Sequence, residues 1–362
     1  MSSITKKYNI NGPVNIIRLE NSKNKKIIYL FGDFHYDVSQ ANECDGRGKE
    51  TIDVDKFFQK LFIKESRKQF DFFIETFQNN FVNDYHTYKT NYINQVRKLV
   101  TSQINIKDNK VQTASDYKNV RFHYFDVRDM LLNVSMLYWE PKNIILPFNL
   151  SQINYYKSII DGEINNINLF LTNIKNNGNI KKVREKYNNS TTKKLIVSRM
   201  DIYINNVKNL IKEYNNINEE LDTNARLLST NYYDEKDIIK MQTSIYLKLT
   251  SAIDEFRNNI TFLTDLFLIR RFLEKDYINN GIVYCGAAHM THIAYVLVKL
   301  FDYNITNISH SRVNVDKLNQ EIKKMNTIDN NYLFYLLYIG YYSDPKPLYQ
   351  CSTLETFPDN LS

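Results

Sequence analysis

The stretch KIIYLFGDFH at residues 26–35 decides the fold, because an apolar, partly β-branched run ends there in a glycine. Such a run predicts a buried strand that delivers its last residues to a loop. In α/β proteins, chemistry is often carried by residues at strand ends. The segment therefore predicts a sheet with His35 at its rim.

Strand and helix patterns alternate around this first strand. Strands are predicted at 70–75, 120–126 and 281–285, a further one at 304–310, and amphipathic helices at 54–67 and 289–301. Strand, helix and strand in succession favour parallel pairing through right-handed crossovers. The sequence thus predicts an α/β fold with a mainly parallel sheet flanked by helices.

The middle of the chain has a different character. Residues 151–229 are rich in Asn, Lys and Ile and show helical periodicity, and a long helical region with at most one break follows at 234–277. We therefore predict four parts. They are a first part of the α/β core at 1–150, a large helical insertion or cap at 151–250, a second part of the core at 251–325, and a C-terminal helix with a surface tail at 326–362.

Composition narrows the class of protein. The 362 residues are 43% hydrophobic, which is enough for a substantial core, and the net charge of +7 comes from lysines interleaved with acids. We therefore expect no specific nucleic-acid partner. The absence of a signal peptide or an apolar span favours a cytoplasmic or virion location and no membrane partner. The Asn, Lys and Ile bias is typical of an AT-rich genome, as in a parasite, a symbiont or a large DNA virus.

The three cysteines are Cys44, Cys285 and Cys351. Their number is odd, and their spacing fits neither a zinc module nor a disulfide framework. We expect free thiols in a reducing compartment.

Two short motifs share one form: an apolar strand, a glycine, two residues and a histidine. They are GDFH at 32–35 and GAAH at 286–289. Glycine permits a tight turn at a strand end, and the histidine then projects from the following loop or helical turn. With 9 glycines and 6 histidines in the chain, about 0.15 such motifs are expected by chance. The pair therefore indicates a shared site.

Glu75 ends the apolar strand FDFFIE at 70–75. A carboxylate is costly inside a core but suits the rim of a parallel sheet. Three strands would then bring His35, Glu75 and His289 together as ligands of a divalent metal or, without metal, as general bases. The sequence leaves both mechanisms open, and His292 is expected to be solvated or to support His289.

These motifs resemble the TraB/TIKI superfamily, which includes ChaN-like and erythromycin-esterase-like proteins. That grouping is marked by two Gly-x-x-His motifs, a Glu and an Arg in an α/β fold with helical additions, and the match covers about 25–129 and 254–310. The resemblance implies a hydrolase of peptide or ester bonds, with His35, Glu75 and His289 as catalytic or metal-binding residues. The metal would be Mn, Co, Zn or Fe. For the arginine, Arg257 is favoured over Arg270 and Arg271, and members differ in reaction, so no substrate follows.

Two other hypotheses stand beside this one. The chain could be a non-catalytic structural or interaction protein, such as a virion component, that makes particle or oligomer contacts through the helical insertion. As a third choice, DFH at 33–35 resembles the first motif of calcineurin-like metallophosphoesterases, although the sequence lacks the downstream motifs of that family.

Overall fold

The computed structural model describes residues 8–38, 44, 50–64, 68–77, 91–107, 110–113, 116–132, 149–185, 190–230, 234–338, 350–358 and 361. The chain divides into two compact units. One comprises Met1–Asp126 and Phe267–Ser362, and the other Val127–Leu266. The second unit includes residues 151–250, for which a helical insertion or cap is predicted, and extends beyond them at both ends.

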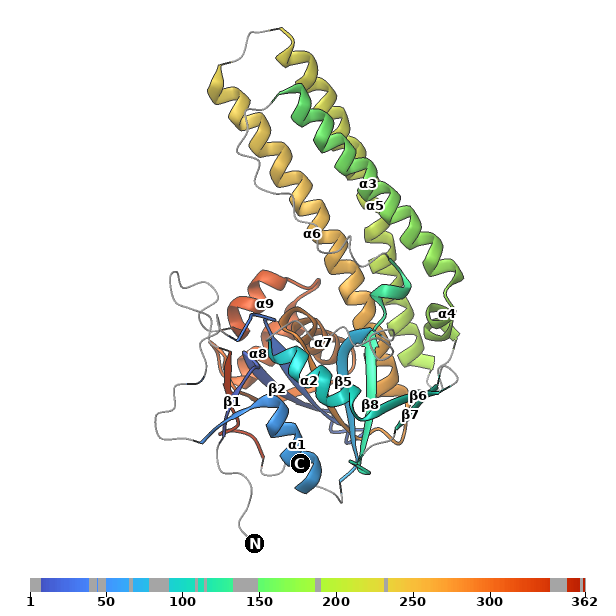
Figure 1. Ribbon diagram of the computed structural model, residues 1–362, viewed down its shortest axis with the longest axis vertical. Coiled ribbons are helices and arrows are strands. Elements are labelled where there is room, and N and C mark those ends of the chain that lie inside the picture. The colour runs from blue at the N-terminus through green and yellow to red at the C-terminus, as the bar shows by residue number, and fades with distance from the viewer. Residues whose placement is uncertain are drawn as a thin grey trace. The chain divides into compact units, whose positions relative to one another are not determined.

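A six-stranded sheet in the order β10-β2-β3-β9-β5-β8 forms the centre of the first unit (Figure 1). The strands are β2 (Asn15–Glu20), β3 (Ile27–Asp33), β5 (Phe70–Phe77), β8 (Val120–Asp126), β9 (Asn280–Gly286) and β10 (Asn304–Ile308). The four strands β3, β9, β5 and β8 pair in parallel, whereas β2 is antiparallel to both of its neighbours. The predicted mainly parallel sheet is confirmed.

Helices cover both faces of this sheet because its strands alternate apolar side chains between the two sides. On one face, α1 (Val54–Lys64) and α2 (Tyr92–Thr101) join a core cluster with the sheet. The ring of Phe58 in α1 lies 5.0 Å from that of Phe31 and 4.8 Å from that of Phe72. On the other face α7 (Ala287–Leu300) packs so closely that a Cβ on Gly32 would lie 2.8 Å from the sulfur of Met290.

A second sheet of three strands, in the order β11-β1-β4, brings the C-terminal segment against the N-terminal one. Its strands are β1 (Asn9–Asn11), β4 (Thr51–Asp53) and β11 (Cys351–Thr353). The side chains of Gln350 and Ser352 are fully buried. This part of the predicted surface tail is therefore not on the surface, because β11 pairs with β1.

A disulfide joins Cys44 to Cys351 at the start of β11. The expectation of three free thiols was wrong for this pair, and the inference of a reducing compartment loses its basis. Sequence spacing could not indicate the pairing, because the two cysteines are 307 positions apart and only the second sheet brings them together. Cys285 is free and buried.

The first unit contains four further described elements. They are the hairpin β6 (Ile104–Lys107) and β7 (Lys110–Thr113), α8 (Val315–Lys324) and α9 (Asn330–Leu337).

Long helices make up the second unit, which begins with a short 3-10 turn, η2 (Arg128–Met130). The helices are α3 (Leu150–Asn176), α4 (Gly178–Glu185), α5 (Ser190–Leu228) and α6 (Glu235–Glu274), the last of which continues into the first unit. Aromatic pairs join them, with ring centres 6.0 Å apart for Phe170 and Phe256 and 5.5 Å apart for Tyr203 and Phe262. The helix α6 runs without a break, and among the described helices none is long and apolar enough to cross a membrane.

Candidate functional site

The three predicted residues come from three neighbouring strands. In the parallel ladder Asp33 is opposite Gly286, and Ile74 is opposite Tyr284, so β3, β9 and β5 end at the same rim. His35 follows β3, Glu75 lies near the end of β5, and His289 lies in the first turn of α7 directly after β9. Register and chain direction together therefore place all three at one edge of the sheet.

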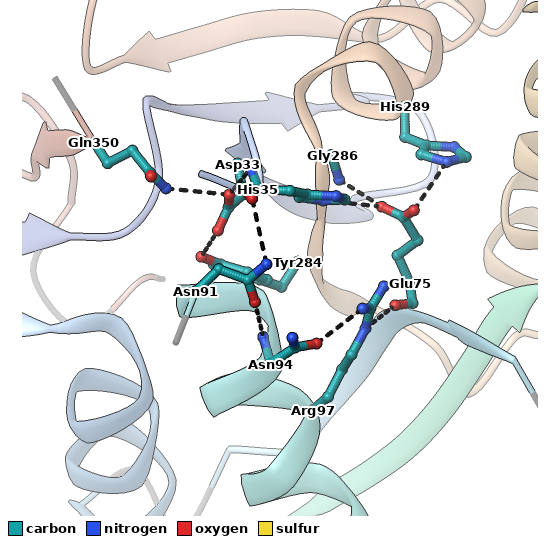
Figure 2. A network of polar contacts seen from close by, with 10 residues as sticks. All are labelled: Asp33, His35, Glu75, Asn91, Asn94, Arg97, Tyr284, Gly286, His289 and Gln350. Atoms are coloured by element: carbon teal, nitrogen blue, oxygen red, sulfur yellow. Dashed lines mark hydrogen bonds and ion pairs between the residues drawn. The ribbon is translucent and has the colours of Figure 1, made fainter. Parts of the chain in front are cut away.

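The carboxylate of Glu75 lies between the two imidazoles (Figure 2). Its Oε2 atom is 3.6 Å from Nε2 of His35, and its Oε1 atom is 3.5 Å from Nε2 of His289. The backbone N–H of Gly286 also donates to Oε2, at 2.6 Å. Since Glu75 is only 3% exposed, these contacts replace the water that its charge would otherwise require.

Both motif glycines are needed because other side chains approach their Cα atoms closely, and not because the backbone turns there. A Cβ on Gly286 would lie 3.3 Å from Glu75 Oε2 and 3.3 Å from His35 Nε2, and Gly32 is crowded by Met290. Gly286 has an ordinary φ of −59°, and among the described glycines a positive φ occurs at Gly12. The prediction that these glycines form tight turns was wrong, because Gly32 belongs to β3 and Gly286 is the last residue of β9.

The side chain of His35 is 34% exposed, yet its Nε2 atom is buried without a hydrogen-bond partner. Burial lowers the pKa of His35, and the charges of Glu75 and Asp33 oppose that shift. The imidazole is therefore neutral at pH 7. A neutral ring with an unpartnered nitrogen can accept a proton or bind a cation.

Helix α2 adds a set of contacts that the sequence patterns did not predict. Asn91 caps α2 by accepting from the N–H of Asn94, and its side chain donates to the carbonyl of His35 at 3.3 Å. Arg97 donates from NH1 to Asn94 and from Nε to the carbonyl of Glu75, at 3.1 Å and 2.7 Å (Figure 2). Residues 92–100 have apolar side chains at helical spacing, and the asparagine that precedes them is an N-cap signal. This pattern could have predicted the helix.

Asp33 lies under the loop that carries His35. It is 1% exposed, and it accepts from the hydroxyl of Tyr284 at 2.6 Å, from Gln350 at 3.2 Å and from the N–H of His35. Burial raises the pKa of Asp33, and the hydrogen bonds from the Tyr284 hydroxyl and from the backbone N–H of His35 oppose this rise. No sequence signal pointed to Tyr284 or Gln350.

The predicted arginine belongs to the helical unit. Arg257 lies 3.6 Å from Asp254 in α6, and its charge opposes the effect of burial, which raises the pKa of Glu163 in α3. Arg270 and Arg271 lie further along α6. In the first unit Arg97 is an arginine that contacts Glu75.

Two other histidines, His292 and His123, are buried in the first unit. His292 is fully buried on α7, which excludes the solvated role. His123 forms a hydrogen bond of 2.7 Å with Asp71 of β5, and the same carboxylate forms an ion pair with the partly exposed Arg121.

Two imidazoles and a carboxylate are suitable ligands for Zn, Mn, Co or Fe, and the buried, unpartnered Nε2 of His35 fits that chemistry. Over the part of the chain that the structure describes, however, no group of three or more His, Cys, Asp or Glu side chains is arranged to hold a metal ion. The donor types fit a metal, whereas their present arrangement does not form a metal centre.

Comparisons with known proteins find one family and several similar proteins. The chain matches a family of unknown function, DUF5847, over residues 8–176 and 140–362. It is similar to three uncharacterized proteins of Acanthamoeba polyphaga mimivirus. The identities are 31%, 30% and 27%, covering 97%, 96% and 97% of this chain and 98%, 96% and 97% of the relatives. No solved structure is a significant match.

Proposed function

The chain belongs to DUF5847, a family of unknown function, and we propose that it is a hydrolase of ester or peptide bonds whose reaction is carried by His35, Glu75 and His289. One observation carries this proposal: the buried carboxylate of Glu75 faces the Nε2 atoms of both motif histidines, at 3.6 Å and 3.5 Å. The resemblance to the TraB/TIKI superfamily supports it as an analogy.

In the proposed reaction His35 acts as the general base. Its imidazole is neutral at pH 7, and its Nε2 atom has no hydrogen-bond partner. A water molecule that donates a hydrogen bond to Nε2 of His35 would lose that proton to the ring as its oxygen attacks the carbonyl carbon of the substrate. The same proton would then pass from the imidazolium to the leaving alkoxide or amine, which completes the transfer.

Glu75 and His289 support this step by charge and position. The carboxylate faces the same Nε2 atom and stabilises by its charge the imidazolium that forms on His35, whereas the acid of a Ser-His-Asp triad contacts the other ring nitrogen. His289 is held edge-on by Phe125, with ring centres 5.7 Å apart, and faces the second oxygen of Glu75. The positive charge of Arg97, which contacts the Glu75 carbonyl, is our candidate for stabilising the oxyanion.

Metal assistance is a second route within the same proposal. A divalent ion bound by His35, Glu75 and His289 would lower the pKa of a coordinated water. Because the described side chains are not arranged as a metal centre, the proposed steps involve only His35, Glu75, His289 and Arg97.

The test compares hydrolysis of a panel of chromogenic esters and fluorogenic peptides by the wild type and by the His35→Gln and His289→Gln variants. We expect turnover by the wild type that falls at least ~100-fold in each variant. Elemental analysis of the same samples, purified without chelator, distinguishes the routes. Metal in stoichiometric amount that is lost in the variants would support the second route, and its absence from all samples would support the first.

The structural alternative is favoured by the helical unit. The helix α6 exposes Ile239 and Leu247, at 53% and 59%, and the three similar proteins reported above belong to a virus. On this alternative the chain is a virion component with contacts through that unit. Recovery of the protein in purified particles, together with no turnover of any panel member, would support it over the hydrolase.

The third choice, a metallophosphoesterase, needs Asp33 as a metal ligand. The carboxylate of Asp33 is buried and accepts from Tyr284, Gln350 and the N–H of His35. Because the carboxylate of Asp33 already accepts these three hydrogen bonds, it is poorly suited to be a metal ligand.

A further inference from the structure

The backbone of His35 is in an unusual conformation. Its φ is 60°, in the left-handed region that residues with a side chain seldom adopt. The described non-glycine residues that share a positive φ are Lys25, Asp302 and Leu361. None of these belongs to the site, so the feature at His35 calls for a local cause.

Side chains hold both backbone groups of His35. Its N–H donates to Oδ1 of Asp33, two residues earlier, and its carbonyl accepts from Nδ2 of Asn91 at 3.3 Å. Local bonding of an Asp side chain to a backbone N–H two residues on is a recognised way to form a turn. The two bonds together hold the peptide units on either side of the His35 Cα atom.

Asp33 is in turn held by groups that come from other parts of the first unit. Tyr284 of β9 donates to Oδ2 at 2.6 Å, and Gln350, next to β11, donates to Oδ1 at 3.2 Å (Figure 2). Gln350 also donates to the carbonyl of Gly12 at 3.0 Å. All three side chains are at most 1% exposed, so their geometry is set by packing and not by solvent.

We propose that Asp33 is a positioning residue, which holds His35 in the left-handed conformation that directs its Nε2 atom toward Glu75. Tyr284 and Gln350 serve this role by holding the carboxylate. Asp33 makes its hydrogen bonds to these residues and to the backbone of His35, and so acts through His35. The inference rests on the proposed function for its effect on rate, but its effect on the geometry of His35 is independent of that function.

An Asn at position 33 separates this role from a catalytic one. Its Oδ1 atom can accept from the N–H of His35 as the carboxylate does, and its Nδ2 atom can donate to the Tyr284 hydroxyl, which is able to accept. An Ala at the same position removes the acceptor altogether. A positioning role thus predicts that Asp33→Asn keeps the orientation of His35, whereas Asp33→Ala loses it.

The experiment measures two properties of the wild type, Asp33→Asn and Asp33→Ala. The first is the NMR signal of the His35 ring, assigned by its loss in His35→Gln and recorded at a pH above the His35 pKa, so that the ring is neutral in every variant. The second is the rate of hydrolysis of the best panel substrate. We expect the ring signal of Asp33→Ala to move away from the wild-type position and its rate to fall by about 100-fold, as small misplacements of reacting groups do. Asp33→Asn should keep the signal and lie within a few-fold of the wild-type rate.

Two results would overturn the proposal. One is an unchanged His35 signal in Asp33→Ala. This result would overturn the proposal even if the chain hydrolyses no substrate. The other is a rate loss in Asp33→Asn as large as in Asp33→Ala, which would assign the effect to the charge. If Asp33→Ala fails to fold, Tyr284→Phe and Gln350→Ala take its place, and each should shift the His35 signal in part. An unchanged signal in both would also count against the proposal.

Discussion

Glu75 Oε1 lies 3.5 Å from Nε2 of His289, and this contact joins the end of strand β5 to the first turn of helix α7. The other oxygen of the same carboxylate faces His35 of the first motif. One buried acid therefore links two motifs that are far apart in the sequence. The function that we propose depends on this link.

The arginine of the site can be identified by substitution. Arg97→Lys keeps the positive charge but loses the planar fork that contacts Asn94 and the Glu75 carbonyl. We expect kcat to fall by ~10–100-fold, measured on the panel substrate. Arg257→Lys, in the helical unit, is the matched variant and should leave kcat within about two-fold. A larger loss of kcat in Arg257→Lys than in Arg97→Lys would instead identify Arg257 as the arginine of the site.

The second motif glycine can be tested against a glycine in open space. In Gly286→Ala the new methyl group would lie 3.3 Å from both His35 Nε2 and Glu75 Oε2, so we expect a stability loss of about 1–3 kcal/mol and a lower rate. Gly162→Ala in α3 has no atom within 4 Å of the added Cβ and should gain about 0.5–1 kcal/mol. Urea unfolding measures both. Equal effects of the two changes would contradict the close approach at Gly286.

Much of the central sheet could be predicted from the sequence because its strands are buried on both faces. The runs at 27–31 and 281–285 are almost wholly apolar, those at 70–75 and 120–126 are mostly aromatic and β-branched, and each appears as a strand in the structure. Parallel neighbours then bring their C-terminal ends to one rim. For this reason His35, Glu75 and His289 could be placed together without coordinates.

The rest of the site could not be predicted, because its partners are brought in by pairing between distant segments. Strand β2 contains the buried polar residues Asn15 and Arg18, so its sequence is not a continuous apolar run and does not indicate a buried strand. Asn15 donates to the carbonyls of His310 and Leu337, which lie at the other end of the chain. Gln350 reaches Asp33 in the same way, through the pairing of β11 with β1.

The stability of the chain should depend on pH through His310. Burial lowers the pKa of His310, and its hydrogen bond to the carbonyl of Cys351 opposes this. The unfolded chain therefore binds more protons between the lowered pKa and about 6.5, so the free energy of unfolding falls as the pH falls through this window and levels off below it. In urea unfolding at pH 7.5 and pH 5.5, His310→Gln should lose less stability than the wild type. An identical loss in both proteins would refute this assignment.

The disulfide should contribute measurably to stability. Cys44 and Cys351 close a loop of 307 positions, and removing a native disulfide from a folded domain typically costs ~2–5 kcal/mol. We expect dithiothreitol to lower the urea midpoint of the wild type. It should not affect the Cys44→Ser/Cys351→Ser variant, whose midpoint should already be low. A midpoint that is the same for the wild type with and without reductant would show that the bond is absent or without effect.

The most direct test of the central claim is whether Glu75 and His289 act as one unit in catalysis. The measurement is kcat/KM for the wild type, Glu75→Gln, His289→Asn and the variant with both changes, on one panel substrate and with folding checked by circular dichroism. We predict that each single change lowers kcat/KM by at least ~100-fold and that the double variant is little worse than either one, because residues that act as a unit are non-additive. Losses that multiply, or single variants that remain as active as the wild type, would contradict the account.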